Sequence, residues 1–231
     1  MNPDTTTFLL WLREYAIDLG AVIISLTLVA LHYAHLRARV RQDPTYSIHY
    51  VNDLARRIWV ENVMRHAGQD VMAVQTLRNF IMFGILMVST ASLLLIGTLT
   101  LSGQTENIAR SWHALNLTGS HAAQLWIVKV MCLLADFLIA FFAYAMAIRL
   151  ANHVLFMINV PRAAQDQHDV LTPEHVANRL NQAGHMVAIG MRAFFFAIPL
   201  VFWLFGPVFL VLATIGIVVV LSRLDRHQSG F

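Results

Sequence analysis

Four long runs of apolar residues, separated by polar segments, dominate the pattern of the chain. The runs lie at about residues 15–36, 79–101, 125–150 and 193–221. An α-helix needs roughly 20 mostly apolar residues to cross the hydrocarbon core of a bilayer, and each run is long enough. The pattern therefore predicts an all-α fold, a polytopic membrane helix bundle with four transmembrane helices, as a single integral membrane domain over residues 1–231.

The last run leaves two interpretations open, because it contains Pro199 and the pair Gly206-Pro207. One kinked span is favoured, since neighbouring helices can satisfy the backbone groups that a proline frees. The alternative is a short membrane hairpin that returns the C-terminal tail to the cytoplasm. Its second arm would have only about 14 residues, which is short for a full crossing.

Composition agrees with a membrane protein. The 231 residues are 58% hydrophobic and 13% charged, with a mean hydropathy of +0.61; soluble domains carry nearly twice that charged fraction. The N-terminal stretch has no basic region, and Asp4, Glu14 and Asp18 precede or enter the first run. A cleavable signal peptide needs the opposite arrangement, so we expect the first span to be retained. The single cysteine, Cys132, allows no intramolecular disulfide.

Arginines indicate the orientation, because basic residues in short loops favour the cytoplasmic side. They concentrate in loops 37–78 and 151–192, which we predict to be cytoplasmic, with the N-terminus outside a bacterial inner (plasma) membrane. Trp11, Trp112 and Trp126 then fall at the outer interface, which tryptophans favour. One signal disagrees: four spans place the tail outside, although it carries Arg223 and Arg226.

Both cytoplasmic connections are predicted to contain helices. The stretch VNDLARRIWVENVMRHA has apolar residues near one face with arginines beside them, which is typical of a basic amphipathic helix on an anionic leaflet. Thr172 suits a helix N-cap and Pro173 the first helical position, so a second helix is expected to start there and run towards the last span. The expected partners are the lipid bilayer and anionic phospholipid headgroups, and no nucleic acid.

The second run begins with a polar cluster, Gln75, Arg78 and Asn79, whose spacing places the three on one helix face. An interface anchor explains the arginine, which can extend to lipid phosphate. It does not explain the two amides, because an unpaired amide in hydrocarbon is unfavourable. We therefore favour a face that points towards protein or water.

Charged residues also lie inside the apolar runs. Lys129 and Asp136 are seven residues apart, and a charge near the bilayer centre costs at least about 2.5 kcal/mol. The same stripe continues in small residues that allow close helix approach: Ala140, Ala143, Ala147 and Ala151. Helix packing is favoured over an ion or proton path, and the stripe suggests a homo-oligomer. In the first run, Asp18, Ser25 and His32 also recur at intervals of seven.

Polar groups gather at the predicted inner end of the spans, where Arg149, Asn152 and His153 share a face and Arg192 approaches from the last span. If the bundle closes, they could form an inner vestibule suited to anions, phosphate headgroups or hydrated ions. Alternatively, they ring the bundle and hold lipid phosphates. The candidate ligand or pore-lining residues are Gln75, Arg78, Asn79, Arg57, Trp59, Arg149, Asn152, Arg192, Lys129 and Asp136.

Histidines offer a weaker metal or haem hypothesis. His32 and His35 are three residues apart, and with His153 or His185 on the same membrane side they could supply two axial ligands. A complete metal site needs more partners, and with eleven histidines such spacing arises by coincidence. No cofactor is expected, with haem or a metal as the alternative. Catalytic signatures such as a phosphate-binding glycine loop are missing, which favours a non-enzymatic protein.

Several of these stretches together resemble a known family. They are Arg56–Trp59, Ala73–Asn79, Ile148-Arg149, Ile158–Pro161, Leu171–Glu174 and Phe205–Pro207. The resemblance extends from about His32 to Asp225, and the family is an uncharacterised four-span membrane family of bacteria and plants, known only as a domain of unknown function. It implies four helices and a shared role for Gln75, Arg78, Asn79 and the Arg57/Trp59 element, and it supplies no reaction.

The favoured function is therefore a channel- or transporter-like oligomer with a polar, cationic inner vestibule. Two alternatives stay open. One is a haem- or metal-binding redox subunit, and the other is a lipid-binding accessory or structural subunit of a larger membrane complex.

Overall fold

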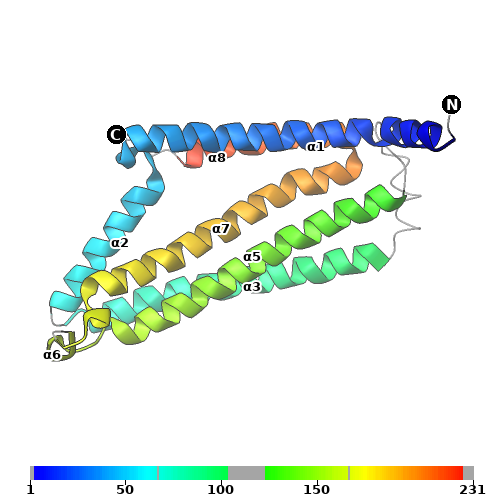
Figure 1. Cartoon of the computed structure of the whole chain (residues 1–231). Coiled ribbons are helices and arrows are strands. Elements are labelled where there is room, and N and C mark those ends of the chain that lie inside the picture. The colour runs from blue at the N-terminus through cyan, green and yellow to red at the C-terminus, as the bar shows by residue number, and fades with distance from the viewer. Residues whose placement is uncertain (1–2, 67, 104–122, 166, 226–231) are drawn as a thin grey trace. The chain divides into compact units, whose positions relative to one another are not determined.

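The computed structural model describes residues 3–66, 68–103, 123–165 and 167–225, and it confirms the all-α prediction. Figure 1 shows the helices in chain order. The long ones are α1 (Pro3–Gln42), α2 (Ile48–Arg65), α3 (Asp70–Gly103), α5 (Ala123–Met157), α7 (Pro173–Phe205) and α8 (Pro207–Leu224). The short ones are η1 (Pro44–Tyr46), α6 (Arg162–Gln165) and η2 (Asp169–Leu171).

In the part of the chain that the structure describes, five helices rather than four are long and apolar enough to cross a membrane: Tyr15–Gln42, Asp70–Thr100, Gln124–Met157, Pro173–Phe205 and Pro207–Leu224. The prediction of one kinked last span is wrong. Gly206 has a φ of 147°, which side chains other than glycine rarely adopt, and it separates α7 from α8. Pro207 then suits the start of α8, because its missing N–H has no helical partner there in any case.

The second arm is also longer than the sequence pattern indicated. α8 has 18 residues, or about 27 Å of helix, because it continues through Ser222 and Arg223 to Leu224. Pro199, by contrast, lies inside α7 and does not end it. The sequence prediction treated Pro199 and Pro207 alike. In the structure the helix is broken only at Pro207, which follows a glycine with a positive φ.

The helices predicted in the two loops are confirmed. The amphipathic stretch forms α2, and Ser47 caps it by accepting a hydrogen bond from the His49 N–H at 3.2 Å. The helix expected at Pro173 does begin there and runs without interruption into the apolar segment, so α7 has 33 residues.

The chain forms two compact units, which share three long helices. Unit 1 comprises Met1–Asp43, Leu94–Phe137 and Phe194–Asp225. The described part of unit 2 comprises Pro44–Leu93 and Leu138–Ala193. α3, α5 and α7 therefore contribute one part to each unit. The single membrane domain stays a prediction.

The core of unit 2 joins four helices. Its buried residues are Val60, Val63 and Met64 of α2, Ala73 and Leu77 of α3, Val154 and the adjoining Ile158 after α5, and Val176, Ala177 and Leu180 of α7. Close approach of α5 and α7 requires Gly190, where a Cβ would lie 2.6 Å from the Tyr144 ring.

The alanine stripe of α5 lies inside this packing, since Ala140, Ala143, Ala147 and Ala151 are all buried within the chain. Small residues there allow the helices of one chain to approach each other. The stripe consequently gives no free surface for a second copy. The argument from these alanines to a homo-oligomer therefore fails, and the oligomer itself stays untested.

In unit 1, α1 and α8 lie side by side (Figure 1). Ala21 of α1 packs with Trp203 of α7 and Leu210 of α8, so α7 and α8 form the hairpin that was the second interpretation. Trp126 packs in a separate cluster with Val130 and Leu204, and its place at the outer interface stays a prediction. The side chains of Trp11 and Trp112 lie outside the described residues.

Candidate functional site

A polar groove lies between α2 and α7 of unit 2. Its volume is about 530 Å³, and it is lined by Tyr50, Asp53, Leu54 and Arg57 of α2 and by Asn178, Asn181, Gln182 and His185 of α7. Seven of these eight side chains carry a hydrogen-bonding group. The groove is therefore a polar concavity.

The sequence builds the groove from one face of each helix. Both sets of lining residues follow the same spacing, with steps of three, one and three residues, which places each set on one side of an α-helix. Val60 and Val63, farther along α2, pack in the core of unit 2 with Val176 and Leu180 of α7. This packing holds the two helices that line the groove together.

Asp53 is the centre of a hydrogen-bonded network in this groove. Its carboxylate accepts from Arg56 Nη2 at 2.6 Å and lies 3.1 Å from His185 Nε2. Arg56 Nε donates to Asn181 Oδ1 at 2.8 Å, and the Asn181 amide donates to the Asp53 carbonyl at 3.3 Å. Gly184 makes room for this guanidinium, because a Cβ there would lie 2.6 Å from Arg56 Cζ. The Asp53 charge is therefore balanced.

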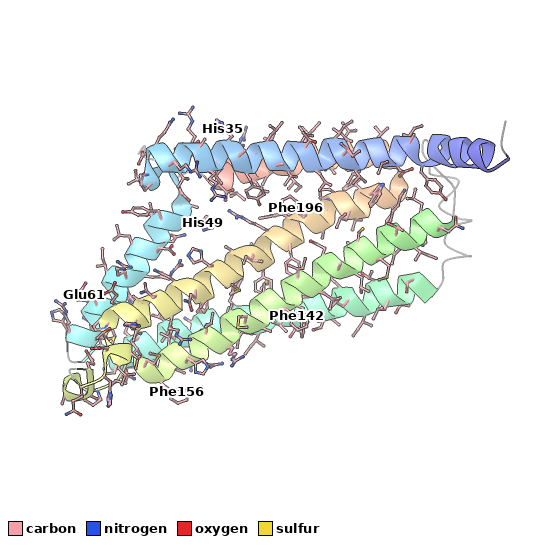
Figure 2. The ribbon with its side chains drawn as sticks, in the orientation of Figure 1. His35, His49, Glu61, Phe142, Phe156 and Phe196 are labelled. Carbon is pink, nitrogen blue, oxygen red and sulfur yellow. The ribbon has the colours of Figure 1, made fainter. Side chains whose placement is uncertain are left out.

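His49, in the first turn of α2 (Figure 2), extends the network towards Arg192. Its Nε2 lies 2.9 Å from Arg192 Nη2, and the His49 and His185 ring centroids are 6.4 Å apart. Arginine is always protonated and only donates hydrogen bonds. His49 Nε2 is therefore the acceptor, and the proton of the neutral ring is on Nδ1.

Arg57 differs from Arg56, because its charge is not balanced by a carboxylate among the described residues. Its Nη2 donates to the uncharged amide oxygen of Asn178 at 3.3 Å, and its side chain is exposed. Gln182 lines the same groove. The groove therefore offers one available cation beside amide and imidazole groups, a set that suits an anion.

The structure brings together only part of the predicted vestibule. Arg57 lines the groove and Arg192 contacts its network. Trp59 is half-buried against the core of unit 2 and lines a separate 370 Å³ cavity with Arg56, Thr76 and Leu77 among others. Arg149 and Asn152 are exposed. Sequence reasoning missed His49, Asp53, Asn178 and Asn181.

The predicted inward orientation of the Gln75, Arg78 and Asn79 cluster is not observed within the chain. All three side chains are exposed, and Arg78 Nη2 donates to Gln75 Oε1 of its own helix at 3.1 Å. The 250 Å³ depression beside them is lined by residues of α3 alone. The buried face of α3 is instead formed by Ala73 and Leu77.

Lys129 belongs to a buried ion pair in unit 1. Its Nζ lies 3.1 Å from Asp18 Oδ1, and the two residues are only 3% and 1% exposed. The Trp203 indole N–H donates to the same oxygen at 2.9 Å, and Lys129 Nζ lies 5.4 Å from the centre of that ring. The cluster joins α1, α5 and α7, which agrees with a packing role. Asp136 is half-buried and stands apart from this pair.

Two of the histidines named in the metal or haem hypothesis each contact an aspartate of their own unit. His32 Nε2 lies 3.6 Å from Asp225 Oδ2 just after α8, and His185 contacts Asp53. His35 and His153 are exposed. Among the described residues, no three His, Cys, Asp or Glu side chains are placed to hold a metal ion.

Comparison with known proteins gives a family and no function. A family model described as a protein of unknown function, DUF599, matches residues 20–229. No curated protein and no solved structure matches the chain. The match agrees with the resemblance to an uncharacterised family seen in the sequence.

Proposed function

Since the chain belongs to the DUF599 family, whose description names no activity, we propose from the α2–α7 groove that the protein is a membrane protein that binds anionic phospholipid. In this proposal the phosphate of a lipid headgroup occupies the groove at the cytoplasmic face. The observation that carries the proposal is the position of Arg57, whose available charge lies beside an exposed apolar stripe of the same helix.

The apolar stripe consists of Tyr50, Leu54 and Ile58, which are 45%, 44% and 58% exposed. Their spacing of four residues places them along one side of α2. An amphipathic helix with such a stripe lies in the interface and buries it among the acyl chains. Tyr50 and Leu54 also line the groove, so this arrangement supports a headgroup entering from the membrane side.

The polar side of the groove supports binding of a phosphate rather than a cation. Asp53 is already paired with Arg56 and His185, which leaves Arg57, Gln182 and the Asn178 amide to donate hydrogen bonds. Phosphate oxygens accept such bonds, and those from a guanidinium are about twice as strong as neutral ones.

The five candidate spans support the proposed sidedness. With the N-terminus outside, five crossings place loops 37–78 and 151–192 and the tail with Arg223 together in the cytoplasm, which removes the disagreement that four spans create. α1 and α8 also run in the same direction, because Ala21 packs near Leu210 and His32 lies near Asp225. A first and a fifth span cross in the same direction.

Binding of anionic lipid in nanodiscs tests the proposal. We expect the wild-type protein to enrich phosphatidylglycerol over phosphatidylcholine in its retained lipid, and Arg57→Ala to weaken this preference roughly tenfold, as expected for a charge-assisted hydrogen bond. Arg65→Ala is the matched control, because it removes a guanidinium from the same helix that pairs with Glu61 at 2.7 Å outside the groove. Equal effects of both substitutions would reject the groove as the site.

A channel- or transporter-like function is the second candidate. The observation that favours it is the buried Lys129–Asp18 pair inside candidate spans, since ionisable residues there commonly mark ion or proton paths. The test is flux of protons and small anions through liposomes that contain the purified protein. Flux that is lost in Lys129→Met, in protein that keeps its fold, would support transport, and no flux in the wild type would reject it.

A further inference from the structure

Unit 1 contains an apolar pocket of about 420 Å³ that is distinct from the α2–α7 groove. Four helices line it: α1 with Ser25 and Leu26, α5 with Cys132, α7 with Phe196 (labelled in Figure 2) and Trp203, and α8 with Thr214. All four helices are long and apolar enough to cross a membrane, so a ligand would reach this pocket from the bilayer.

Ser25 gives the pocket one available hydrogen-bond donor. The residue is only 7% exposed, and its Oγ has no hydrogen-bond partner. Other buried hydroxyls of unit 1 donate to the carbonyl four residues earlier, as Thr98 of α3 does at 2.8 Å and Thr214 of α8 at 2.7 Å. A buried polar group without a partner is unfavourable, so an acceptor supplied by a ligand would stabilise the site.

The depth of Ser25 restricts the class of ligand. Ser25 follows Tyr15, where the apolar run of α1 begins, by ten residues, or about 15 Å of helix. This distance is half of the roughly 30 Å hydrocarbon core, so a span that enters the core at Tyr15 places Ser25 near its centre. The ester carbonyls of phospholipids lie at the edges of the core. An acceptor at the centre must belong to an uncharged lipid whose polar group can enter hydrocarbon.

The walls favour a flat ring. Phe196 and Trp203 both line the pocket, and aromatic side chains stack on planar groups. The Trp203 indole is held in place, because its N–H donates to the buried Asp18 carboxylate at 2.9 Å. Leu26 and Cys132 are exposed at the pocket, which leaves a route for a hydrocarbon tail into the bilayer.

We propose that this pocket binds an isoprenoid quinone. A ring carbonyl accepts the hydrogen bond of the Ser25 hydroxyl, the ring packs against Phe196 and Trp203, and the isoprenoid tail leaves past Leu26 and Cys132. The proposal concerns binding and includes no electron transfer. It is independent of the proposed headgroup site, which lies in unit 2.

Cys132 provides the test, because it is the single cysteine of the chain and it lines the pocket. Its alkylation by N-ethylmaleimide is followed in nanodiscs while decylubiquinone is added. We expect the quinone to slow the alkylation at least threefold. We also expect Ser25→Ala to raise the half-effective quinone concentration roughly tenfold, which corresponds to the loss of one hydrogen bond. The matched control is Thr27→Ala on the same helix, since Thr27 is exposed and donates to its own helix at 2.7 Å.

Two further measurements separate this proposal from its rivals. Lipid extracted from the purified wild-type protein should contain quinone in near-equimolar amount. This measurement does not depend on whether the variants fold. Decylbenzene, which has a ring and a tail but no acceptor, should protect Cys132 at least tenfold less well than the quinone. Equal protection by decylbenzene, unchanged alkylation with quinone, or extracts that contain phospholipid alone would each overturn the assignment.

Discussion

Each unit contains an aspartate that forms an ion pair with a basic side chain, Lys129 in unit 1 and Arg56 in unit 2, and the two sites differ mainly in their access to solvent. In unit 1, Asp18 and Lys129 are 1% and 3% exposed and share a tryptophan. In unit 2, the side chains of Asp53 and Arg56 are 28% and 26% exposed, and that of His185 is 48% exposed. The same chemistry of ion pairing is therefore used in two different environments.

The difference in burial separates structure from binding. Charges that are removed from water must satisfy one another, so the unit 1 pair is a fixed connection between helices. Partly exposed charges keep some contact with solvent and are individually weaker. The unit 2 network consequently stabilises the fold less, but it leaves neighbouring donors such as Arg57 available to a ligand.

The largest effect is expected for Lys129→Met. This substitution removes the cation that pairs with the buried Asp18 carboxylate, and breaking a buried ion pair in this way typically costs about 3–5 kcal/mol. The measurement is the free energy of unfolding in detergent micelles. The double variant Lys129→Met, Asp18→Leu should recover much of the loss, because it removes both charges. A single variant with nearly wild-type stability would contradict the fixed connection.

Gly190→Ala should have the next largest effect. The added Cβ would lie 2.6 Å from the ring of Tyr144, which is fully buried and cannot move aside, so overpacking should cost about 1–3 kcal/mol. Gly97→Ala in unit 1 is the control, because no atom lies within 4 Å of its Cβ position. It should leave the unfolding free energy unchanged or raise it, since alanine favours helix. Equal losses in both variants would show that the close approach of α5 and α7 is not the cause.

Asp53→Asn should cost less, about 1 kcal/mol or below, because the ion pairs that it removes are partly exposed. This loss of stability should still exceed the loss caused by Glu61→Gln on the same helix. Glu61, which is labelled in Figure 2, pairs with Arg65 within α2. Asp53 connects α2 to α7 through His185, whereas the ion pair of Glu61 that the described residues show stays within α2. Urea unfolding of the variants measures the difference, and a larger loss in Glu61→Gln would contradict this order.

The sequence predicted the helices well because their signals are local. Apolar runs, the amphipathic pattern of α2 and the proline at the start of α7 each act within a few residues. The break at Gly206 was only the second interpretation, because its signal is a backbone conformation and a Gly-Pro pair is compatible with a kink as well as with a turn.

The groove could not be derived from the sequence, because its two halves lie more than 120 residues apart, as between Arg57 and Asn178. The spacing of the polar residues is visible in each helix, but many solvent-exposed helix faces have it. The pairing of Asp18 with Lys129 was missed for the same reason, although each residue was identified as a polar position within its own apolar run. Which faces meet is decided by tertiary packing.

Arg78→Ala should have the smallest effect, a change of less than about 0.5 kcal/mol in the free energy of unfolding, as is usual for surface positions. Its hydrogen bond ends on Gln75 of the same helix, and both side chains are exposed. Leu77→Ala, one residue away, should cost about 2–5 kcal/mol because Leu77 is buried in the core of unit 2.

The comparison of Arg78→Ala with Leu77→Ala tests what the exposed polar residues at the start of α3 contact. If the hydrogen bonds of this polar cluster are made within the chain, Arg78→Ala should leave the free energy of unfolding, the lipid preference and the particle mass unchanged. If the exposed face is covered by a second copy of the chain, Arg78→Ala should instead lower the particle mass measured by light scattering. A lower mass would restore the inward-facing role that the sequence suggested, with the partner surface supplied by another chain rather than by this one.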